Sequence, residues 1–230
     1  MENQFQISII DDIIQMNLLD QNIIIPRIAL PEEFLNWQSE SRIKMFKTLT
    51  EEGANAVKVQ PSHLPVMATL GSGEFPINLA TRGMGILPNN ENLKKFTKIF
   101  EEVKKECEGK SWSETLPLRV KTAQNFYSKP GIFDNTILGG LEIFEGQTAN
   151  NLQRNPLVSL IYTGEAPKFL SYQLNGVIKF VDPQNEHYRF LRAARELFAF
   201  DSFHIPQINY PIGYLFYPAE DLNKTPYPRR

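Results

Sequence analysis

The segment from Gly146 to Leu160 carries the side chains that are best suited to binding a ligand. Its sequence predicts a loop, one short helical turn, a break at Asn155 before proline, and then a buried strand. The first N–H groups of a helix have no partner within the helix and carry partial positive charge. Thr148 adds a hydroxyl to these donors and Gln147 adds an amide. The segment therefore predicts an anion site at a helix start beside a sheet, where the phosphate of a bound cofactor could lie.

Purely structural roles are open for the same residues. Thr148 is of a residue type that commonly caps helices. Asn151 and Asn155 are of the type that closes turns, and Arg154 suits a solvated helix position. The segment alone therefore does not decide between ligand binding and local structure.

No spacing typical of a catalytic or metal site occurs in the chain. The histidines, His63, His187 and His204, are far apart and lack metal-ligand spacing. The sequence contains no Gly-x-Ser-x-Gly elbow, no His-Glu-x-x-His pair and no P-loop. Cys107 falls in an apolar helical stripe, which predicts a small core residue rather than a nucleophile. We therefore assign no catalytic residue and expect no metal.

Three tyrosines on predicted strands allow two interpretations. Tyr162, Tyr172 and Tyr214 could stack on a planar ring, but aromatic residues on strands usually pack the core. Both interpretations stay open from the sequence.

The composition limits the class of protein. The net charge of −2 gives no electrostatic footprint for nucleic acid or an anionic membrane. The chain has no apolar run long enough for a membrane span and does not begin like a signal peptide. A single cysteine excludes an internal disulfide framework and fits a reducing compartment. We expect a cytoplasmic protein that binds neither nucleic acid nor membrane.

The elements that must position the Gly146–Leu160 segment are mostly strands. Residues 66–70 and 75–80 are two short apolar runs, and the glycine-rich turn at 71–74 between them predicts a β-hairpin. Residues 169–181 show the clearest alternation of apolar and polar side chains. Gly176 within that run predicts a bulge or a close approach by another backbone. Further strands are expected at 136–144, 157–163 and 212–217.

Helices are predicted in four places. An apolar stripe with period 3.6 predicts a helix at 91–107. Other helices are expected over 32–52, within 110–135 and from 183 to about 200. We expect residues 1–60 to form an N-terminal helical or arm segment, with a strand or helix near Ile7–Ile14 and an extended run at Ile23–Ile25. Residues 61–230 would then form a small antiparallel barrel with a helical insertion at about 88–130.

Four pieces of the chain resemble, in order, the pyridoxamine 5'-phosphate oxidase-like split-barrel family. Together they cover about a third of the chain. The first resembles the family's first hairpin, the second its short helix and following strand, the third its next strand and the fourth its closing strand. The pieces are Met67–Pro76, Thr148–Leu160, Leu174–Pro183 and Gly213–Pro218.

The resemblance implies a mainly β (α+β) fold, a six-stranded antiparallel split β-barrel with flanking helices. It also implies a homodimer that binds flavin mononucleotide (FMN) and acts as an oxidoreductase on a small molecule. The family's phosphate-binding positions, usually a Ser or Thr with an Arg or Lys, fall here on Gly146, Gln147 and Thr148. The usual cation is missing there, so Arg82, Lys129 or Arg154 would have to supply it, and Arg82 is the preferred candidate.

The flavin ring would lie against the hairpin. The predicted cofactor-binding residues are Thr69, Asn78, Arg82, Gln147, Thr148 and Asn151. Two alternatives are open: a flavin-free barrel that binds haem or another planar ligand, and a non-catalytic dimeric domain whose insertion binds a partner protein.

Overall fold

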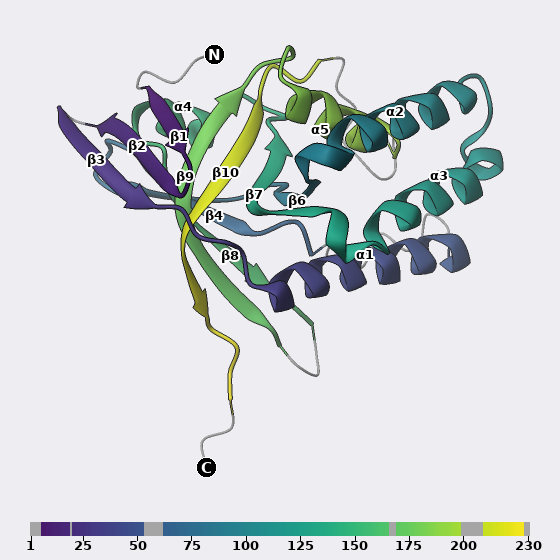
Figure 1. The fold of residues 1–230 in the computed structure, drawn as a ribbon, viewed down its shortest axis with the longest axis horizontal. Coiled ribbons are helices and arrows are strands. Elements are labelled where there is room, and N and C mark those ends of the chain that lie inside the picture. The colour runs from purple at the N-terminus through teal and green to yellow at the C-terminus, as the bar shows by residue number, and fades with distance from the viewer. Residues whose placement is uncertain (1–5, 19, 53–61, 166–168, 199–208, 228–230) are drawn as a thin grey trace.

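The structure, a computed structural model, describes residues 6–18, 20–52, 62–165, 169–198 and 209–227. It is a mixed α+β fold with a large antiparallel sheet, a small second sheet and flanking helices (Figure 1). The strands are β1 (Ile7–Ile10), β2 (Ile13–Leu18), β3 (Gln21–Pro26), β4 (Val66–Leu70), β5 (Ile77–Thr81), β6 (Gly85–Pro88), β7 (Phe133–Leu141), β8 (Leu157–Thr163), β9 (Ser171–Val181) and β10 (Gly213–Asn223). The helices are α1 (Glu32–Glu52), α2 (Asn90–Glu106), α3 (Trp112–Tyr127), α4 (Gln147–Arg154) and α5 (Glu186–Glu196), with a 3-10 turn at Pro130–Ile132.

The large sheet curls into a barrel that is not closed by hydrogen bonds. Among the described residues its order is β5-β4-β8-β9-β10-β7-β6, and all of its pairs are antiparallel. The two edge strands, β5 and β6, are consecutive in the chain and are joined only by residues 82–84. Because three residues span at most about 10 Å, the two edges must approach each other. The predicted split β-barrel is thereby confirmed.

The described part of this sheet has seven strands rather than the predicted six. The additional strand is β6, whose four residues run from Gly85 to Pro88. This strand was not predicted from the sequence, because the glycine and proline at its two ends are residues typical of turns. The predicted insertion begins where β6 ends and comprises α2 and α3, which lie between β6 and β7 in the chain.

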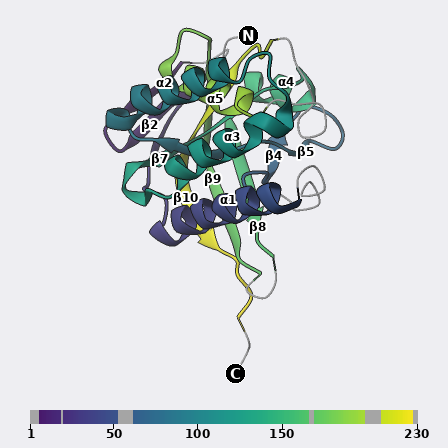
Figure 2. The ribbon, with the colours of Figure 1, turned by 90° about the vertical axis from the view of Figure 1, so that its right-hand side faces the viewer.

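Helices α1, α2, α3 and α5 pack together on one side of the large sheet, whereas α4 packs on the β4–β5 hairpin (Figure 2). The predicted stripe of α2 is buried through Leu93, Phe96 and Phe100, and Cys107 at its C-cap is buried as expected. Tyr162 and Tyr214 are fully buried, and the ring of Tyr172 lies 5.8 Å from that of Trp37. The core interpretation of these tyrosines is therefore correct.

A second, small core joins the N-terminal strands to the opposite face of the large sheet. β1, β2 and β3 form a separate antiparallel sheet. Its buried residues Ile7, Ile14 and Met16 pack against Val177 of β9. Figure 1 shows this sheet and helices α1, α2, α3 and α5 on opposite sides of the large sheet. We call the face that carries β1–β3 the outer face.

The described helices include none that is both long enough and apolar enough to cross a membrane.

Candidate functional site

Five of the six predicted cofactor-binding residues meet in one hydrogen-bonded cluster between α4 and the β4–β5 hairpin. The Asn78 amide nitrogen donates to the hydroxyls of Thr69 and Thr148, each at 3.2 Å. The Asn151 amide nitrogen also donates to Thr69, at 3.1 Å. Gln147 completes the cluster by donating to the Asn151 side-chain oxygen at 2.7 Å. We call Thr69, Asn78, Gln147, Thr148 and Asn151 the α4 cluster.

The α4 cluster is largely buried. Thr69, Thr148 and Asn151 are almost inaccessible to solvent, Asn78 is half-buried and Gln147 is exposed. Thr69 and Asn78 lie opposite each other in the register of β4 and β5, so both side chains project from the same face of the hairpin. Because buried polar groups need partners, the cluster fastens α4 to the hairpin. Gln147 is the member that can also reach a ligand from solvent.

The start of α4 leaves backbone donors available. Its N-cap is Gly146, which has no side chain to cap the helix. Thr148 lies inside the helix, and its hydroxyl accepts a hydrogen bond from Asn78. The capping role considered for Thr148 is therefore wrong. The N–H groups in the first turn of α4 are available to an anion.

Arg82 does not join the α4 cluster. Its guanidinium Nε lies 3.8 Å from the Glu142 carboxylate, and another of its nitrogens donates to the Thr81 carbonyl. Burial raises the pKa of Glu142, while hydrogen bonds from the Phe144 and Ile143 N–H groups and the charge of Arg82 oppose that rise. Arg82 therefore neutralises a buried carboxylate in this structure, and its contact with a phosphate stays a prediction.

The other two cations considered at this corner lie elsewhere. Arg154 is at the C-terminal end of α4 and donates to the Ser72 hydroxyl at 3.2 Å. Lys129 is exposed and follows α3. In the described ranges, the polar contacts of the α4 cluster thus come from neutral side chains.

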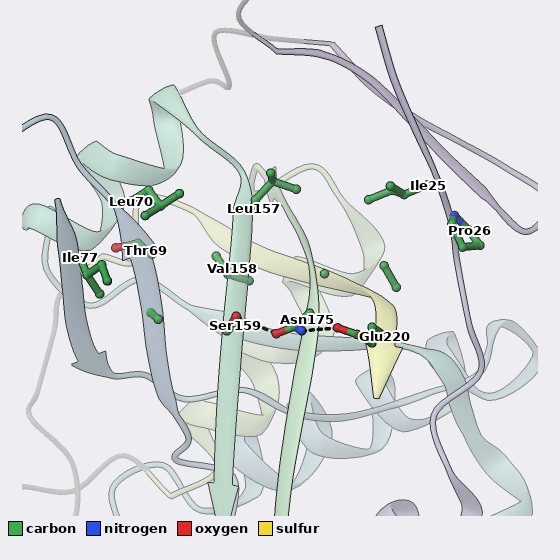
Figure 3. A pocket seen from close by; sticks show the side chains of 13 residues that line it. Ile25, Pro26, Thr69, Leu70, Ile77, Leu157, Val158, Ser159, Asn175 and Glu220 are labelled. Atoms are coloured by element: carbon green, nitrogen blue, oxygen red, sulfur yellow. Dashed lines mark hydrogen bonds between the residues drawn. The ribbon is translucent and has the colours of Figure 1, made fainter. Parts of the chain in front are cut away.

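A groove of about 550 Å³ opens on the outer face, between the hairpin and β3. Figure 3 shows Leu70 and Ile77 at one side of it and Ile25 and Pro26 at the other. Thr69 is among the groove-lining residues and also belongs to the α4 cluster, but its side chain projects from the face of β4 opposite to those of Ala68 and Leu70. The groove and the cluster are therefore adjacent across β4. The described lining residues are Ile25, Pro26, Ala68, Thr69, Leu70, Ile77, Leu157, Val158, Ser159, Asn175, Gly176, Ala219 and Glu220.

A row of three polar side chains crosses this otherwise mostly apolar groove. Ser159 of β8, Asn175 of β9 and Glu220 of β10 are direct cross-strand neighbours. The Ser159 hydroxyl donates to the Asn175 side-chain oxygen at 2.6 Å, and the Asn175 amide donates to Glu220 at 2.5 Å (Figure 3). Gln173 donates to the same Asn175 oxygen at 3.0 Å. The orientation of the Asn175 amide is therefore fixed.

This row was not predicted from the sequence. The available signal was the alternation along β9, which places Ser171, Gln173 and Asn175 on the polar side of the strand. The same alternation places Ser159 on the side of β8 opposite buried Val158 and Leu160. The position of Glu220 depends on an irregularity in β10 that the sequence did not reveal.

The outward face of the hairpin is apolar and exposed. Phe75 retains 92% of its accessible surface, and Leu70, Ile77 and Leu79 are exposed as well. Leu70 and Ile77 are register partners, so the exposed surface continues into the groove. Contiguous apolar surface of this kind is typical of a binding interface.

The two described histidines, His63 and His187, are not among the residues that line the groove. The Nδ1 atom of His63 is 2.8 Å from a guanidinium nitrogen of Arg42. Burial lowers the pKa of His187, which lies in the first turn of α5. His204 lies outside the described residues. Across the described part of the chain, His, Cys, Asp and Glu side chains form no group that could hold a metal ion.

Comparisons with known proteins return only remote structural likenesses. No family model matches the chain, and no curated protein matches its sequence. The chain is similar to the crystal structure of HupZ from Group A Streptococcus, with 12% identity, a TM-score of 0.40, and coverage of 70% of this chain and 85% of that one. A variant of that protein, with alanine in place of one histidine, gives 12% identity, a TM-score of 0.39 and coverage of 70% and 89%. An F420 reductase gives 11% identity, a TM-score of 0.37 and coverage of 70% and 90%.

Proposed function

We propose that this protein binds FMN and acts as an oxidoreductase on a small molecule. The observation that carries the proposal is the adjacency of the apolar groove and the α4 cluster at Thr69. Ligand pockets typically have volumes of roughly 300–1,000 Å³ and combine apolar walls with a few polar groups. The groove has this size and composition.

The flavin ring would lie in the groove beside the hairpin. Ala68, Leu70 and Ile77 offer an apolar surface there, and the side chains around it would exclude water from the ring. When bound, the flavin would supply the electron chemistry. This fits a chain in which no acid-base pair or nucleophile was recognised from the sequence.

The phosphate would lie at the start of α4. The uncapped first turn supplies N–H groups, and exposed Gln147 supplies an amide. These donors fit phosphate oxygens, but they are neutral and compensate little of the phosphate charge. We therefore expect the phosphate to contribute less to affinity than the ring.

The exposed hairpin supports a homodimer as part of this proposal. Phe75, Ile77 and Leu79 would be covered by a second copy, which would also enclose the groove. The same surface supports the alternative of a non-catalytic interaction domain, whose partner would be a different protein. Haem receives less support, because neither described histidine lines the groove.

A flavin titration tests the proposal. FMN fluorescence should be quenched on binding to the wild-type protein, and riboflavin should bind with an affinity within about tenfold of FMN, since a phosphate bound by neutral donors adds little. Ala68→Leu should weaken FMN binding at least about tenfold, because the larger side chain would occupy the place of the ring. Such overpacking costs about 1–3 kcal/mol of binding free energy. Ala29→Leu is the matched control, since Ala29 is exposed and lies outside the groove lining. Absence of quenching with the wild-type protein, or equal affinities for the wild type and Ala68→Leu, would contradict the proposal.

A further inference from the structure

The end of the groove farthest from the hairpin carries a charged side chain, whereas the proposed ring site is apolar. Of the thirteen described lining residues, Glu220 is the one with a charged side chain. It adjoins Ala219 and Asn175 at this end, and the hydrogen-bonded row continues from Asn175 to Ser159, which lies beside Ala68 of the hairpin (Figure 3). This end of the groove is therefore anionic and would repel a phosphate or a carboxylate.

Backbone geometry places Glu220 in the groove. The register of β10 shifts between Pro218, which pairs with Gly176, and Glu220, which pairs with Asn175. Ala219 is the inserted residue, and such a bulge turns the following side chain to a different face of the strand. Without the shift, Ala219 rather than Glu220 would lie opposite Asn175.

Gly176 makes the bulge possible. A Cβ atom at this position would lie 2.2 Å from the Tyr217 carbonyl oxygen and 2.7 Å from the Phe216 ring. The two backbones therefore approach more closely than any other residue would allow. The glycine and the bulge together hold Glu220 beside Asn175.

Glu220 also has unused acceptor capacity. Its Oε2 accepts from Asn175, whereas its Oε1 receives no hydrogen bond from the described residues. Within the described ranges, no Lys, Arg or His forms an ion pair with it. A carboxylate without a cationic partner, beside apolar walls and next to a fixed amide, is suited to bind a cationic donor group.

We infer that Glu220, Asn175 and Ser159 form a subsite for a small molecule that combines an apolar body with a protonated amine. The amine would donate to the Glu220 carboxylate, and the apolar body would lie against Leu157 and Ile25. The inference rests on the proposed flavin function in one respect: if FMN binds in the groove, this molecule is the substrate and lies beside the ring. The subsite itself depends only on the groove.

The test compares three aromatic probes of equal size: naphthylmethylamine, naphthylmethanol and naphthoate. Their affinities would be measured by calorimetry near neutral pH for the wild-type protein, Glu220→Gln and Asp221→Asn. Asp221 is the matched control, because it is the next residue on β10, is also an exposed carboxylate, and projects from the opposite face of the strand. Thermal unfolding would verify that both variants are folded.

We expect the amine to bind about fivefold more tightly than the alcohol, because Glu220 is exposed and such a charge pair contributes modestly. The acid should bind most weakly. The preference for the amine should disappear in Glu220→Gln and persist in Asp221→Asn. Equal affinities for the three probes, binding of none of them, or a preference that survives in Glu220→Gln would overturn the inference.

An FMN titration of the same variants separates this result from the proposed function. FMN should bind Glu220→Gln at least as tightly as it binds the wild type, since the change removes a negative charge. If FMN binds no variant while the amine preference depends on Glu220, the flavin proposal fails and the subsite stands. If FMN binds but the amine is not preferred, the subsite fails and the flavin proposal stands.

Discussion

Replacing Thr69 by valine should destabilise the protein, because it removes a hydroxyl oxygen that accepts two hydrogen bonds. Valine keeps the shape of threonine and suits a strand, so packing changes little. The Thr69 hydroxyl accepts from both Asn78 and Asn151. After the substitution Asn78 still donates to Thr148, but the Asn151 amide nitrogen has lost its acceptor in a nearly inaccessible position.

The magnitude follows from that buried donor. An unsatisfied buried polar group costs about 1–3 kcal/mol. For a chain of this size, about 2 kcal/mol corresponds to a fall in melting temperature of roughly 4–8 °C. We therefore expect Thr69→Val to lower the free energy of unfolding by about 2 kcal/mol.

Urea denaturation followed by circular dichroism measures the effect. Ser159→Ala is the control, because the Ser159 hydroxyl is a partly accessible donor whose loss leaves Asn175 paired with Gln173. It should change the free energy of unfolding by less than about 1 kcal/mol. A double-mutant cycle of Thr69→Val with Asn151→Ala should show coupling, since the two residues share a hydrogen bond. If Thr69→Val changes stability by no more than Ser159→Ala does, or if the two cluster substitutions are additive, the account of the cluster is refuted.

Two further predictions concern the frame around the site. Gly176→Ala should destabilise the protein by about 1–3 kcal/mol or more, because its Cβ would overlap the Tyr217 carbonyl oxygen; Gly73→Ala, where no atom lies within 4 Å of the added Cβ, should be close to neutral in the same urea titration. The raised pKa of Glu142 means that its carboxyl favours the folded state when protonated, so its contribution to stability is present below the ordinary value of 4.5 and is lost as the pH rises through the higher folded-state pKa. Glu142→Gln should remove this part of the pH dependence above the ordinary pKa of 4.5. Plots of the free energy of unfolding against pH that stay parallel for the wild type and the variant in that range would contradict the assignment.

Local patterns predicted most of the frame. Alternation along β9 and the turn between β4 and β5 are properties of consecutive residues, so the sequence alone locates these strands. Thr69 and Asn78 were placed together at the flavin ring through the family resemblance, and the hairpin turn explains why they are neighbours. Their meeting with Thr148 was expected only from the order of family-like segments, because nothing in the local sequence shows that α4 lies on the hairpin.

Tertiary contacts explain what the sequence did not predict. Arg82 was expected at a phosphate, but its guanidinium is directed to Glu142, which is distant in the chain. The groove depends on the packing of β3 against the outer face and on the bulge that places Glu220. Neither feature leaves a pattern among neighbouring residues. Pairing of β6 with β7 likewise depends on a chain reversal through α2 and α3.

The most direct test of the central claim is the absorption spectrum of freshly purified protein, recorded from the near ultraviolet to the visible before and after addition of FMN. The account predicts the visible bands of a flavin that stays with the protein through gel filtration, and their loss in Ala68→Leu but not in Ala29→Leu. A protein that remains colourless after incubation with FMN and gel filtration would contradict it.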